Sequence, residues 1–583
     1  MINFIKNILS TIIGIIISII ILVSIFALIS IKSTDTKKDL DEPHTLIIKL
    51  DKLVQDRSFE SPFNIDFLNQ GTNSLSLNSL LEFIEKASKD PNINGIHLDF
   101  NNSGLNAGFA SLEEIRNSLI KFKEAGKFIN SYSKNYSQKE YYIASICDNI
   151  FLYPSGSISL TGLNSSILFL KKFLEKIGIQ PQIIRHGKFK SAIEPLIKEE
   201  MSKESKKQNQ RLINTIWNEI ANEISISRNI PIKKFNTIIN NFIIQSASDA
   251  ISYDLVDSLF YKDELEKFYT IFFNKEKINE VNFISFKDYK KIPIKNLSKK
   301  YKKNKIAVIY AQGDITDGKG NFNQIGSESI VKDIRKAYKD EKTKAIVLRI
   351  NSPGGSALAS DVILRELNIA KRNKPLIVSF GDVAASGGYY IACNADKIFS
   401  SKNTITGSIG VFGVLMNLEK FNQNIGLSYD NVKTSKYSDF ADPSRPLNDE
   451  EKIILQSQIE RTYDLFLSHV SNGRDLSKNR VDEIGQGRVW SGVDALQNNL
   501  VDEFGGLNDA ILEASKMSGL DEFRVWELPE SKDKFFEVFT SFKTILHGYF
   551  ININSDYNLI NTIDKVNKLE KIQTRVPFDL ILN

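Results

Sequence analysis

The strongest constraint on this chain is an internal repeat. Short segments of the region around residues 140–260 recur in the same order around residues 388–505. The matching pairs are Tyr141–Ala144 with Tyr389–Ala392, Asp148–Phe151 with Asp396–Phe399, Thr161–Gly162 with Thr406–Gly407, Glu194–Pro195 with Asp442–Pro443, Asp249–Ala250 with Asp494–Ala495, and Leu255–Asp257 with Leu500–Asp502. Agreement at so many ordered points predicts two homologous units in tandem.

Each unit shows alternating strand-like and helix-like segments. In the first, Ile93–Phe100 and Phe128–Tyr132 predict strands, and Leu112–Phe122 predicts an amphipathic helix between them. In the second, Lys305–Tyr310 and Ala345–Ile350 predict strands. This alternation is typical of an α/β domain with a largely parallel sheet. A chain of 583 residues is also too long for one ordinary core.

The amino-terminal region predicts a membrane anchor. Residues 8–31 are almost unbroken apolar sequence without a charge, and about 20 such residues span a bilayer. An A-x-A-like cleavage site is absent, so we expect an uncleaved anchor. Flanking lysines do not favour export of the large C-terminal part, although long domains translocate largely regardless of charge. We expect a flank at 1–7, a transmembrane anchor at 8–31, a linker at 32–42, an N-terminal domain at 43–298, a C-terminal domain at 299–530 and a tail at 531–583.

Composition excludes several classes of function. The net charge of +5 is small for this length and gives no case for nucleic-acid binding. Cys147 and Cys393 form no CxxC pattern, and the five histidines do not cluster with acids at metal-ligand spacing. We therefore expect no metal site, no disulfide framework and no cofactor.

Ser386 stands between a predicted strand, Pro375–Phe380, and a predicted helix that starts near Tyr389. Small residues around it let the backbone bend sharply, and amides at a helix N-terminus favour negative charge. This environment suits a nucleophilic serine, although a tight turn with a serine N-cap is the alternative. The G-x-S-x-G elbow is absent, because residue 384 is alanine.

The two halves differ at their reactive positions. The first-half counterpart of Ser386 is Gln138, in a segment without glycines, and the second-half counterpart of Lys190 is Ser438. Each half therefore keeps one reactive group and lacks the other. A single site shared between the halves would explain this division.

Lys190 is the candidate base for Ser386, since a serine hydroxyl needs one and no histidine lies near it in sequence. A spatially close histidine stays open as an alternative. Burial can lower a lysine pKa far below its reference of about 10.4, and apolar Phe189, Ala192 and Ile193 lie beside Lys190. The alternative is a surface lysine in a basic loop.

Two further segments complete the candidate site. The turn with Gly354 and Gly355 follows a strand and, with the Gly387 amide, would form an oxyanion hole, or it is only a structural turn. Ser408 lies in Thr404–Gly410, where it would orient a lysine amine or merely cap a turn.

The set of motifs resembles the signal peptide peptidase A family, also called protease IV, in its long duplicated form. The motifs are Asn351–Gly355, Ala384–Tyr390, Thr406–Val411 and Lys190–Pro195. The resemblance implies two tandem ClpP/crotonase-like domains, Ser386 as nucleophile, Lys190 as general base and Ser408 as its assistant. It also implies a homo-oligomer, reported as a tetramer for the long form, anchored in the bacterial inner membrane. Its domains would face the periplasm, and its substrates would be cleaved signal peptides and other apolar peptides.

Two other hypotheses for the function remain. The crotonase fold also hosts acyl-CoA enzymes that use an oxyanion hole without a serine nucleophile. An export anchor and the split of Ser386 and Lys190 between the halves argue against this class. The second is an inactive membrane scaffold of the same fold, against which the presence of Ser386, Lys190 and Ser408 argues.

Overall fold

The computed structural model of the chain describes residues 42–57, 74–101, 104–292, 302–321, 324–530 and 572–575, together with residues 14, 17, 18 and 40. The span predicted at residues 8–31 lies almost wholly outside this part, as does most of the tail predicted at 531–583. Among the helices of the described part, none is long and apolar enough to cross a membrane.

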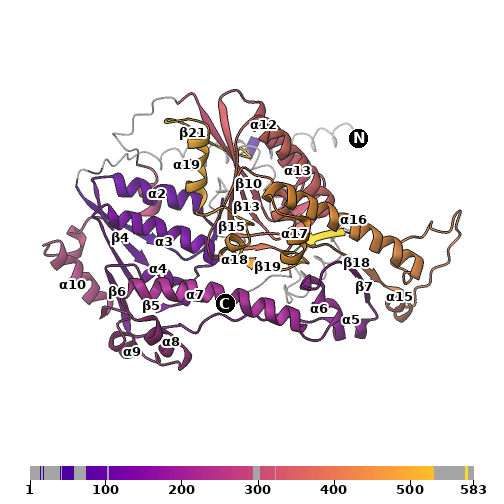
Figure 1. Cartoon of the computed structure of the whole chain (residues 1–583). Coiled ribbons are helices and arrows are strands. Elements are labelled where there is room, and N and C mark those ends of the chain that lie inside the picture. Colours follow the sequence, from indigo (N-terminus) through magenta and orange to yellow (C-terminus); the bar gives the residue numbers. More distant parts are fainter. Residues whose placement is uncertain are drawn as a thin grey trace.

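The first half is drawn mainly in indigo to magenta in Figure 1 and the second in salmon to yellow. The two halves build sheets with the same strand order. The first sheet runs β9-β1-β4-β5-β6-β8, and the second runs β21-β10-β13-β15-β16-β20, with β17 and then β19 joined to β15. Pairing is parallel throughout these two six-strand series, which confirms the predicted α/β class. The strands are β1 (His44–Lys49), β4 (Ile93–Asp99), β5 (Phe128–Tyr136), β6 (Asn149–Ile158), β8 (Ser258–Leu259), β9 (Phe283–Ser285), β10 (Lys305–Gln312), β13 (Thr343–Ser352), β15 (Leu376–Ala385), β16 (Lys397–Ser400), β17 (Ile405–Gly407), β19 (Val489–Ser491), β20 (Glu503–Phe504) and β21 (Arg524–Leu528).

Helices cover these sheets, so the central strands are apolar on both faces. In β13, every residue from Ala345 to Ile350 is buried. The amphipathic helix predicted at Leu112–Phe122 is α3, which extends from Phe109 to Glu124. The longer helices are α2 (Leu77–Lys89), α3, α7 (Lys203–Ser227), α8 (Ile232–Asn240), α10 (Lys262–Phe272), α12 (Ser327–Lys339), α13 (Ala357–Lys371), α16 (Asp449–Arg474) and α19 (Leu507–Met517); the shorter ones are α4 (Gln138–Ala144), α5 (Lys171–Ile177), α6 (Glu194–Ile197), α9 (Ala247–Ser252), α11 (Phe286–Tyr289), α14 (Gly387–Ala392), α15 (Glu419–Asn424), α17 (Lys478–Ile484) and α18 (Gly492–Gln497).

A third sheet joins the halves. Its order is β12-β11-β14-β22-β18-β7, with bounds β7 (Gln180–Arg185), β11 (Asp314–Thr316), β12 (Gln324–Gly326), β14 (Gly354–Ser356), β18 (Phe412–Asn417) and β22 (Ile572–Arg575). A separate pair is formed by β2 (Leu53–Gln55) and β3 (Ser74–Ser76). Strand β7 belongs to the first half but pairs antiparallel with β18 of the second. The first-half segment that contains Lys190 therefore packs against the second half.

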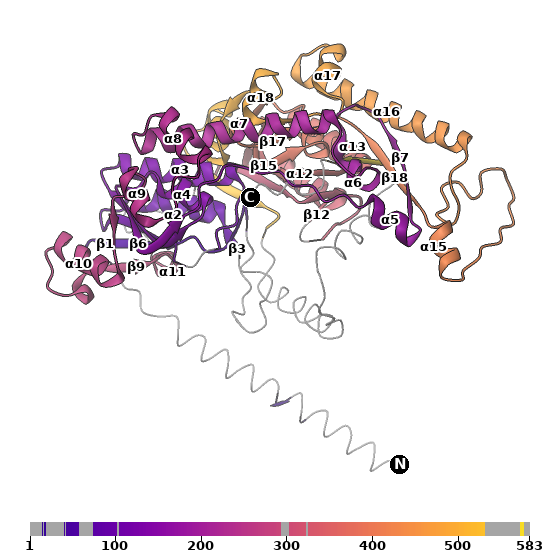
Figure 2. The same ribbon diagram turned by 90° about the horizontal axis from the view of Figure 1, so that it is seen from below.

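Helix α7 also crosses between the halves (Figure 2). It packs on the first-half core through Leu212, Ile216 and Ile220. Toward the second half, its Arg211 forms an ion pair of 2.8 Å with Asp494. The segment from β7 through α7 thus fixes the two halves relative to each other.

Candidate active site

Ser386 lies on a strained turn between β15 and α14. Its φ is 56° and its ψ is −115°, a conformation that a non-glycine residue adopts at a cost of roughly 1–3 kcal/mol. The Ser386 amide donates to the Gly407 carbonyl at 2.8 Å, which fixes the turn to β17. A Cβ added at Gly388 would lie 2.7 Å from the Ser352 carbonyl oxygen, so only glycine fits there. These contacts fix the strained backbone of Ser386, which lies at the predicted turn between a strand and a helix.

Three of the predicted residues meet at one point. Lys190 Nζ lies 2.8 Å from Ser386 Oγ, 3.0 Å from Ser408 Oγ and 3.1 Å from the Ser408 carbonyl oxygen. All three residues are fully buried. A neutral lysine amine has two N–H donors and one lone pair. When the amine is neutral, the two Ser408 oxygens can accept its two N–H groups, and its lone pair is then available to the Ser386 hydroxyl.

Burial lowers the pKa of Lys190 well below its ordinary value, because the charged ammonium loses its water. The ring of Phe412 lies 5.9 Å from Nζ and forms part of the apolar surroundings. The amine is therefore deprotonated at a lower pH than an exposed lysine. This is the state in which it can take a proton from a hydroxyl.

The loop that carries Lys190 is held by residues that the sequence analysis did not identify. Gln208 on α7 donates to the Phe189 carbonyl at 3.4 Å and to Ser191 Oγ at 3.2 Å, and it accepts from the Val489 amide at 3.0 Å. Gln208 therefore ties both neighbours of Lys190 to β19 of the second half. It stands among other polar residues of a long helix, where no local pattern marks it out.

Close contact between the Gly487 backbone and Lys190 also supports the lysine loop. Gly487 has a φ of 80°, and a Cβ added there would lie 2.6 Å from Lys190 Cβ. Its neighbour Gln486 accepts a hydrogen bond from the Phe189 amide at 3.0 Å. The turn of the second half thus forms the surface on which the lysine loop lies.

The counterpart positions form no second site of this kind. Gln138 begins α4 at the same place in the first half, where its side chain accepts from the amides of Thr161 and Gly162 at 3.2 and 3.0 Å. Ser438 is exposed, and its hydroxyl contacts Thr434 and Ser435. The first-half position that corresponds to Ser386 is therefore filled by an amide side chain that bonds the Thr161–Gly162 turn of the same half.

The three proposed oxyanion donors lie beside the Ser386 turn. Gly387 is the first residue of α14, and Gly354 and Gly355 begin β14 with φ values of 103° and 155°. A Cβ at Gly355 would lie 2.0 Å from the Ile315 carbonyl oxygen, so β14 requires glycine there. The Gly354 amide donates a hydrogen bond of 3.2 Å to Ser352 Oγ. An oxyanion would therefore share this donor with the Ser352 hydroxyl.

The described histidines are engaged elsewhere. His97 bonds Tyr269, His186 bonds Glu460, and His469 lies 3.3 Å from Asp361, while His44 contacts the Glu42 carbonyl. Among described residues, Lys190 is the basic side chain in contact with Ser386.

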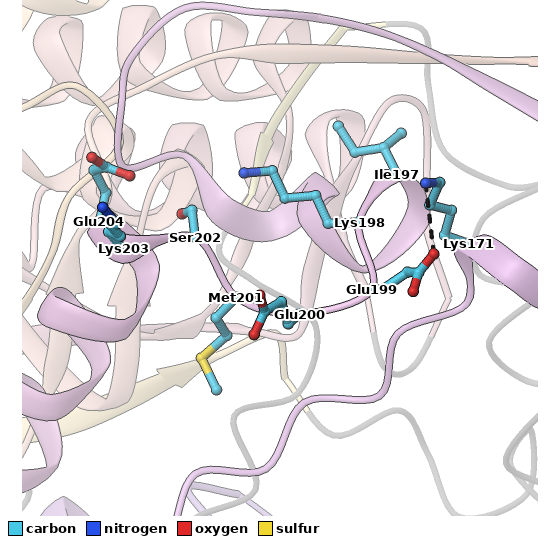
Figure 3. Close-up of a pocket in the computed structure, with 9 residues that line it drawn as sticks. All are labelled: Lys171, Ile197, Lys198, Glu199, Glu200, Met201, Ser202, Lys203 and Glu204. Carbon is cyan, nitrogen blue, oxygen red and sulfur yellow. Dashed lines mark ion pairs between the residues drawn. The ribbon is translucent and has the colours of Figure 1, made fainter.

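A separate surface pocket of about 580 Å³ lies at the start of α7 (Figure 3). It is lined by Lys171 and Ile197–Glu204, and Lys171 pairs with Glu199 at 3.9 Å. Its lining contains neither Lys190 nor Ser386. We assign it no part in the chemistry.

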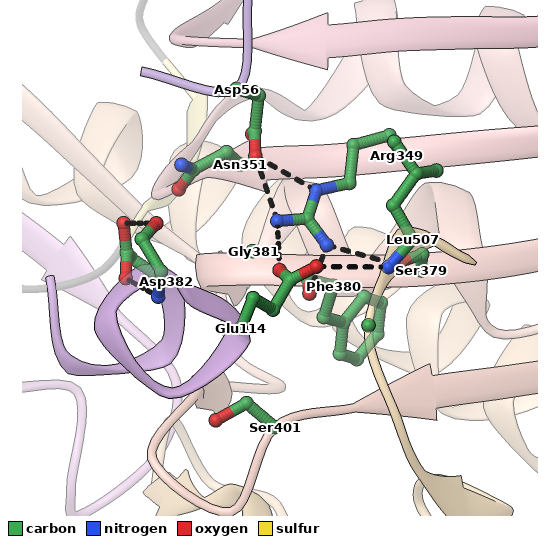
Figure 4. A network of polar contacts seen from close by, with 12 residues as sticks. Asp56, Glu114, Arg349, Asn351, Ser379, Phe380, Gly381, Asp382, Ser401 and Leu507 are labelled. Carbon is green, nitrogen blue, oxygen red and sulfur yellow. Dashed lines mark hydrogen bonds and ion pairs between the residues drawn. The ribbon is translucent and has the colours of Figure 1, made fainter. Parts of the chain in front are cut away.

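A buried ion cluster lies where the halves meet, near the strand that leads to Ser386 (Figure 4). Arg349 on β13 contacts Asp56 at 2.7 Å and Glu114 at 2.5 Å, and these side chains are 1, 3 and 8% exposed. Arg349 also donates to Ser379 Oγ and the Phe380 carbonyl on β15. Both carboxylates come from the first half, so the cluster connects the halves beside the β15 strand.

Asp382 makes a second connection of this kind. Its carboxylate accepts from the Ser111 amide at 2.9 Å and the Ser111 hydroxyl at 2.7 Å, in the first turn of α3. Burial raises the pKa of Asp382, and the bonds from Ser111 oppose that shift. Asp382 therefore ties the strand before Ser386 to a first-half helix.

Comparison with known proteins decides the family. The model of peptidase family S49 matches residues 121–269 and 368–521, one segment in each half. The chain belongs to peptidase family S49. It is a serine peptidase. A model of ClpP-like SDH-type serine proteinases also matches residues 245–419.

Relatives of known name resemble most of the chain. Protease 4 of Haemophilus influenzae is 39% identical over 445 residues, which is 74% of this chain and 72% of that protein. Protease 4 of Salmonella typhi is 36% identical over 79% of this chain and 74% of its own. The chloroplastic serine protease SPPA of Arabidopsis thaliana is 33% identical over 86% and 74%. Family membership favours the peptidase reading over an acyl-CoA enzyme.

Ser408→Ala tests the support of the lysine amine. The change removes one of the two acceptors for its N–H groups, so we expect kcat to fall about 10-fold, the effect of one hydrogen bond, with KM unchanged. Steady-state hydrolysis of a fluorogenic peptide measures both constants. Ser438→Ala, on the exposed counterpart loop, is the control and should leave both unchanged. An unchanged kcat in Ser408→Ala would show that the hydroxyl has no part in the reaction.

Proposed function

We propose that this S49 peptidase works through a Ser386–Lys190 dyad and hydrolyses cleaved signal peptides and other apolar peptides. The contact of 2.8 Å between Lys190 Nζ and Ser386 Oγ in a fully buried site carries the proposal. The relatives named Protease 4 support the activity. Among the described residues, no contact of comparable specificity favours another function.

The proposed reaction is acyl transfer. Neutral Lys190 removes the Ser386 proton as Oγ attacks the peptide carbonyl, and amides of Gly387 and the Gly354–Gly355 segment stabilise the oxyanion. Protonated Lys190 then gives its proton to the leaving amine. Water, deprotonated by the same lysine, hydrolyses the acyl-enzyme. Ser408 keeps the amine aimed at Oγ throughout.

The pH dependence of kcat/KM follows from the lowered pKa of Lys190. Only the neutral amine can act as a base, so activity is lost as pH falls through that pKa and rises to a plateau above it. Because burial lowers the pKa, we expect half-maximal activity well below pH 10.5, the ordinary lysine value. Rates from pH 5 to 11 on an uncharged peptide measure this. A midpoint at the ordinary lysine value would contradict the buried base.

The proposal also covers the membrane in which the enzyme lies, the side that its domains face and the number of chains that assemble. The apolar segment at residues 8–31 supports a single-pass anchor in the inner membrane. The family resemblance suggests in addition that both halves lie in the periplasm and that four chains assemble. Such an anchor holds the site close to released signal peptides, which partition to the bilayer. Carbonate extraction, protease accessibility in spheroplasts and light scattering of the detergent-solubilised chain test these three features in turn.

A further inference from the structure

Arg488 lies in the turn that supports the lysine loop, directly before β19. Its guanidinium carbon is 3.8 Å from the centre of the Phe189 ring, so the cation lies over the side chain that precedes Lys190 in the chain. The Arg488 carbonyl accepts the Ser408 amide at 2.7 Å. One residue of the second half therefore contacts both the loop that carries the base and the serine that orients it.

Among the described residues, no carboxylate forms an ion pair with Arg488. Its Nε atom is buried and has no hydrogen-bond partner in the described part of the chain. Burial lowers the pKa of the guanidinium, and the nearby cation of Arg211 lowers it further. Because a buried donor without a partner destabilises a fold, we do not expect a residue in this arrangement to serve stability alone.

The internal repeat places a different residue at this position in the first half. Ser246 and Ser491 are the N-caps of the corresponding helices α9 and α18. The residues three positions before these serines are Ile243 and Arg488. The half without the nucleophile thus has an aliphatic side chain here, and the cation occurs in the half that receives the lysine loop.

The lowered pKa of Lys190 depends on the same loop. It arises from burial, because the charged amine loses its water. Phe189 is only half-buried, and its amide and carbonyl form the bonds of the loop to Gln486 and Gln208. A guanidinium that holds the Phe189 ring therefore keeps these bonds in place and water away from the amine.

We propose that Arg488 is a positioning residue for the Ser386–Lys190 dyad. Its side chain holds Phe189 and its carbonyl holds Ser408, so that the amine stays dry and aimed at the nucleophile. The inference rests on the proposed function and adds a residue that acts on its base. Arg488 itself exchanges no proton in the reaction.

Arg488→Met tests this role, because it removes the cation from the Phe189 ring and keeps an unbranched side chain. We expect kcat for a fluorogenic peptide to fall about 10-fold, the size of effect of one such contact, with KM unchanged. Since the amine becomes better hydrated, we also expect the midpoint of the kcat/KM profile to move to higher pH. Arg461→Met, at an exposed position of α16, is the control and should change neither. A lower kcat without the shift in pH would show a merely structural effect and overturn the proposal.

A double-mutant cycle with Phe189 shows whether the contact itself is the cause. Phe189→Leu removes the ring and should reproduce both effects of Arg488→Met, whereas Phe189→Tyr keeps the ring and should retain the unaltered values. The double variant with Phe189→Leu and Arg488→Met should be no less active than either single variant, because both changes break one contact. Effects that multiply in the double variant would contradict this route.

Fluorophosphonate labelling separates this inference from the proposed function, because the reagent reports activation of Ser386 and needs no peptide. We expect folded Arg488→Met to be labelled about 10-fold more slowly than the unaltered chain. A folded Arg488→Met with unchanged kcat, labelling rate and pH midpoint overturns this inference and leaves the dyad standing. A folded Lys190→Met that keeps full activity overturns both.

Discussion

Ser386→Ala and Lys190→Met are each expected to lower kcat for peptide hydrolysis at least about 10⁴-fold, the size of effect seen when a nucleophile or its base is removed. The two side chains are in contact at 2.8 Å and act as one unit. The double variant should therefore be no less active than either single variant. Methionine matches the length of lysine, so the buried volume around position 190 is nearly kept.

The controls for this experiment lie close by in sequence. Lys188 is exposed two residues before Lys190, and Ser438 is the exposed counterpart of Lys190 in the second half. Lys188→Met and Ser438→Ala should retain full activity. Circular dichroism and thermal melting of each variant show whether it is folded. A folded Lys190→Met with retained activity would mean that another group serves as base.

Arg349→Met is expected to destabilise the chain by roughly 3–5 kcal/mol, because it leaves two buried carboxylates without their cation. Asp56 and Glu114 are 3 and 8% exposed and come from the first half, whereas Arg349 comes from the second. Chemical denaturation measures the change. Arg480→Met, which breaks an ion pair with Glu483 in which both side chains are exposed, is the control and should change stability little.

The pH dependence of that loss has a definite sign. Burial already raises the pKa of Glu114, and Arg349 opposes this shift. Without the guanidinium, we expect the pKa of Glu114 to be higher in the folded variant than in the unfolded chain, so the folded variant stays protonated to a higher pH. Its stability therefore falls as pH rises through the unfolded pKa, and the deficit relative to the unaltered chain is largest at neutral pH and smaller near pH 4. A variant of unchanged stability, or a deficit that grows toward acid pH, would contradict the role of Arg349.

Adding Asp56→Asn and Glu114→Gln to Arg349→Met separates charge from packing. Neutral amides no longer need a buried cation, so we expect part of the lost stability to return. Arg349 also donates to the Phe380 carbonyl on the strand that leads to Ser386. Peptide hydrolysis by the triple variant therefore tests whether loss of this bond lowers activity. If charge is not the cause, the triple variant should be no more stable than Arg349→Met.

The sequence contained enough to predict the reactive residues. Duplicated segments place Gln138 opposite Ser386 and Ser438 opposite Lys190, so a comparison within one chain shows which half lacks which group. The strand–turn–helix pattern around Ser386 is local and short, and the turn lies where it was predicted. The structure adds the distances that join Lys190, Ser386 and Ser408.

The supporting contacts could not be predicted, because they join residues far apart in sequence. Gln208 bonds Val489, and Arg349 bonds Asp56, in each case across about half the length of the chain. An arginine inside the apolar run of β13 gives no sign of its partners. The pairing of β22 with β14 is also invisible in the sequence, since backbone bonds leave no pattern of side chains.

The measurement that tests the central claim most directly is the rate at which a fluorophosphonate labels the full chain, from pH 5 to 11, in the unaltered protein and in Lys190→Met. This reaction requires the activated nucleophile and no peptide recognition. The account predicts that mass spectrometry finds the label on Ser386, that the rate rises with pH to a midpoint below 10.5, and that Lys190→Met is labelled at least 10³-fold more slowly. Labelling of folded Lys190→Met at the unaltered rate would show that the two halves do not share one site.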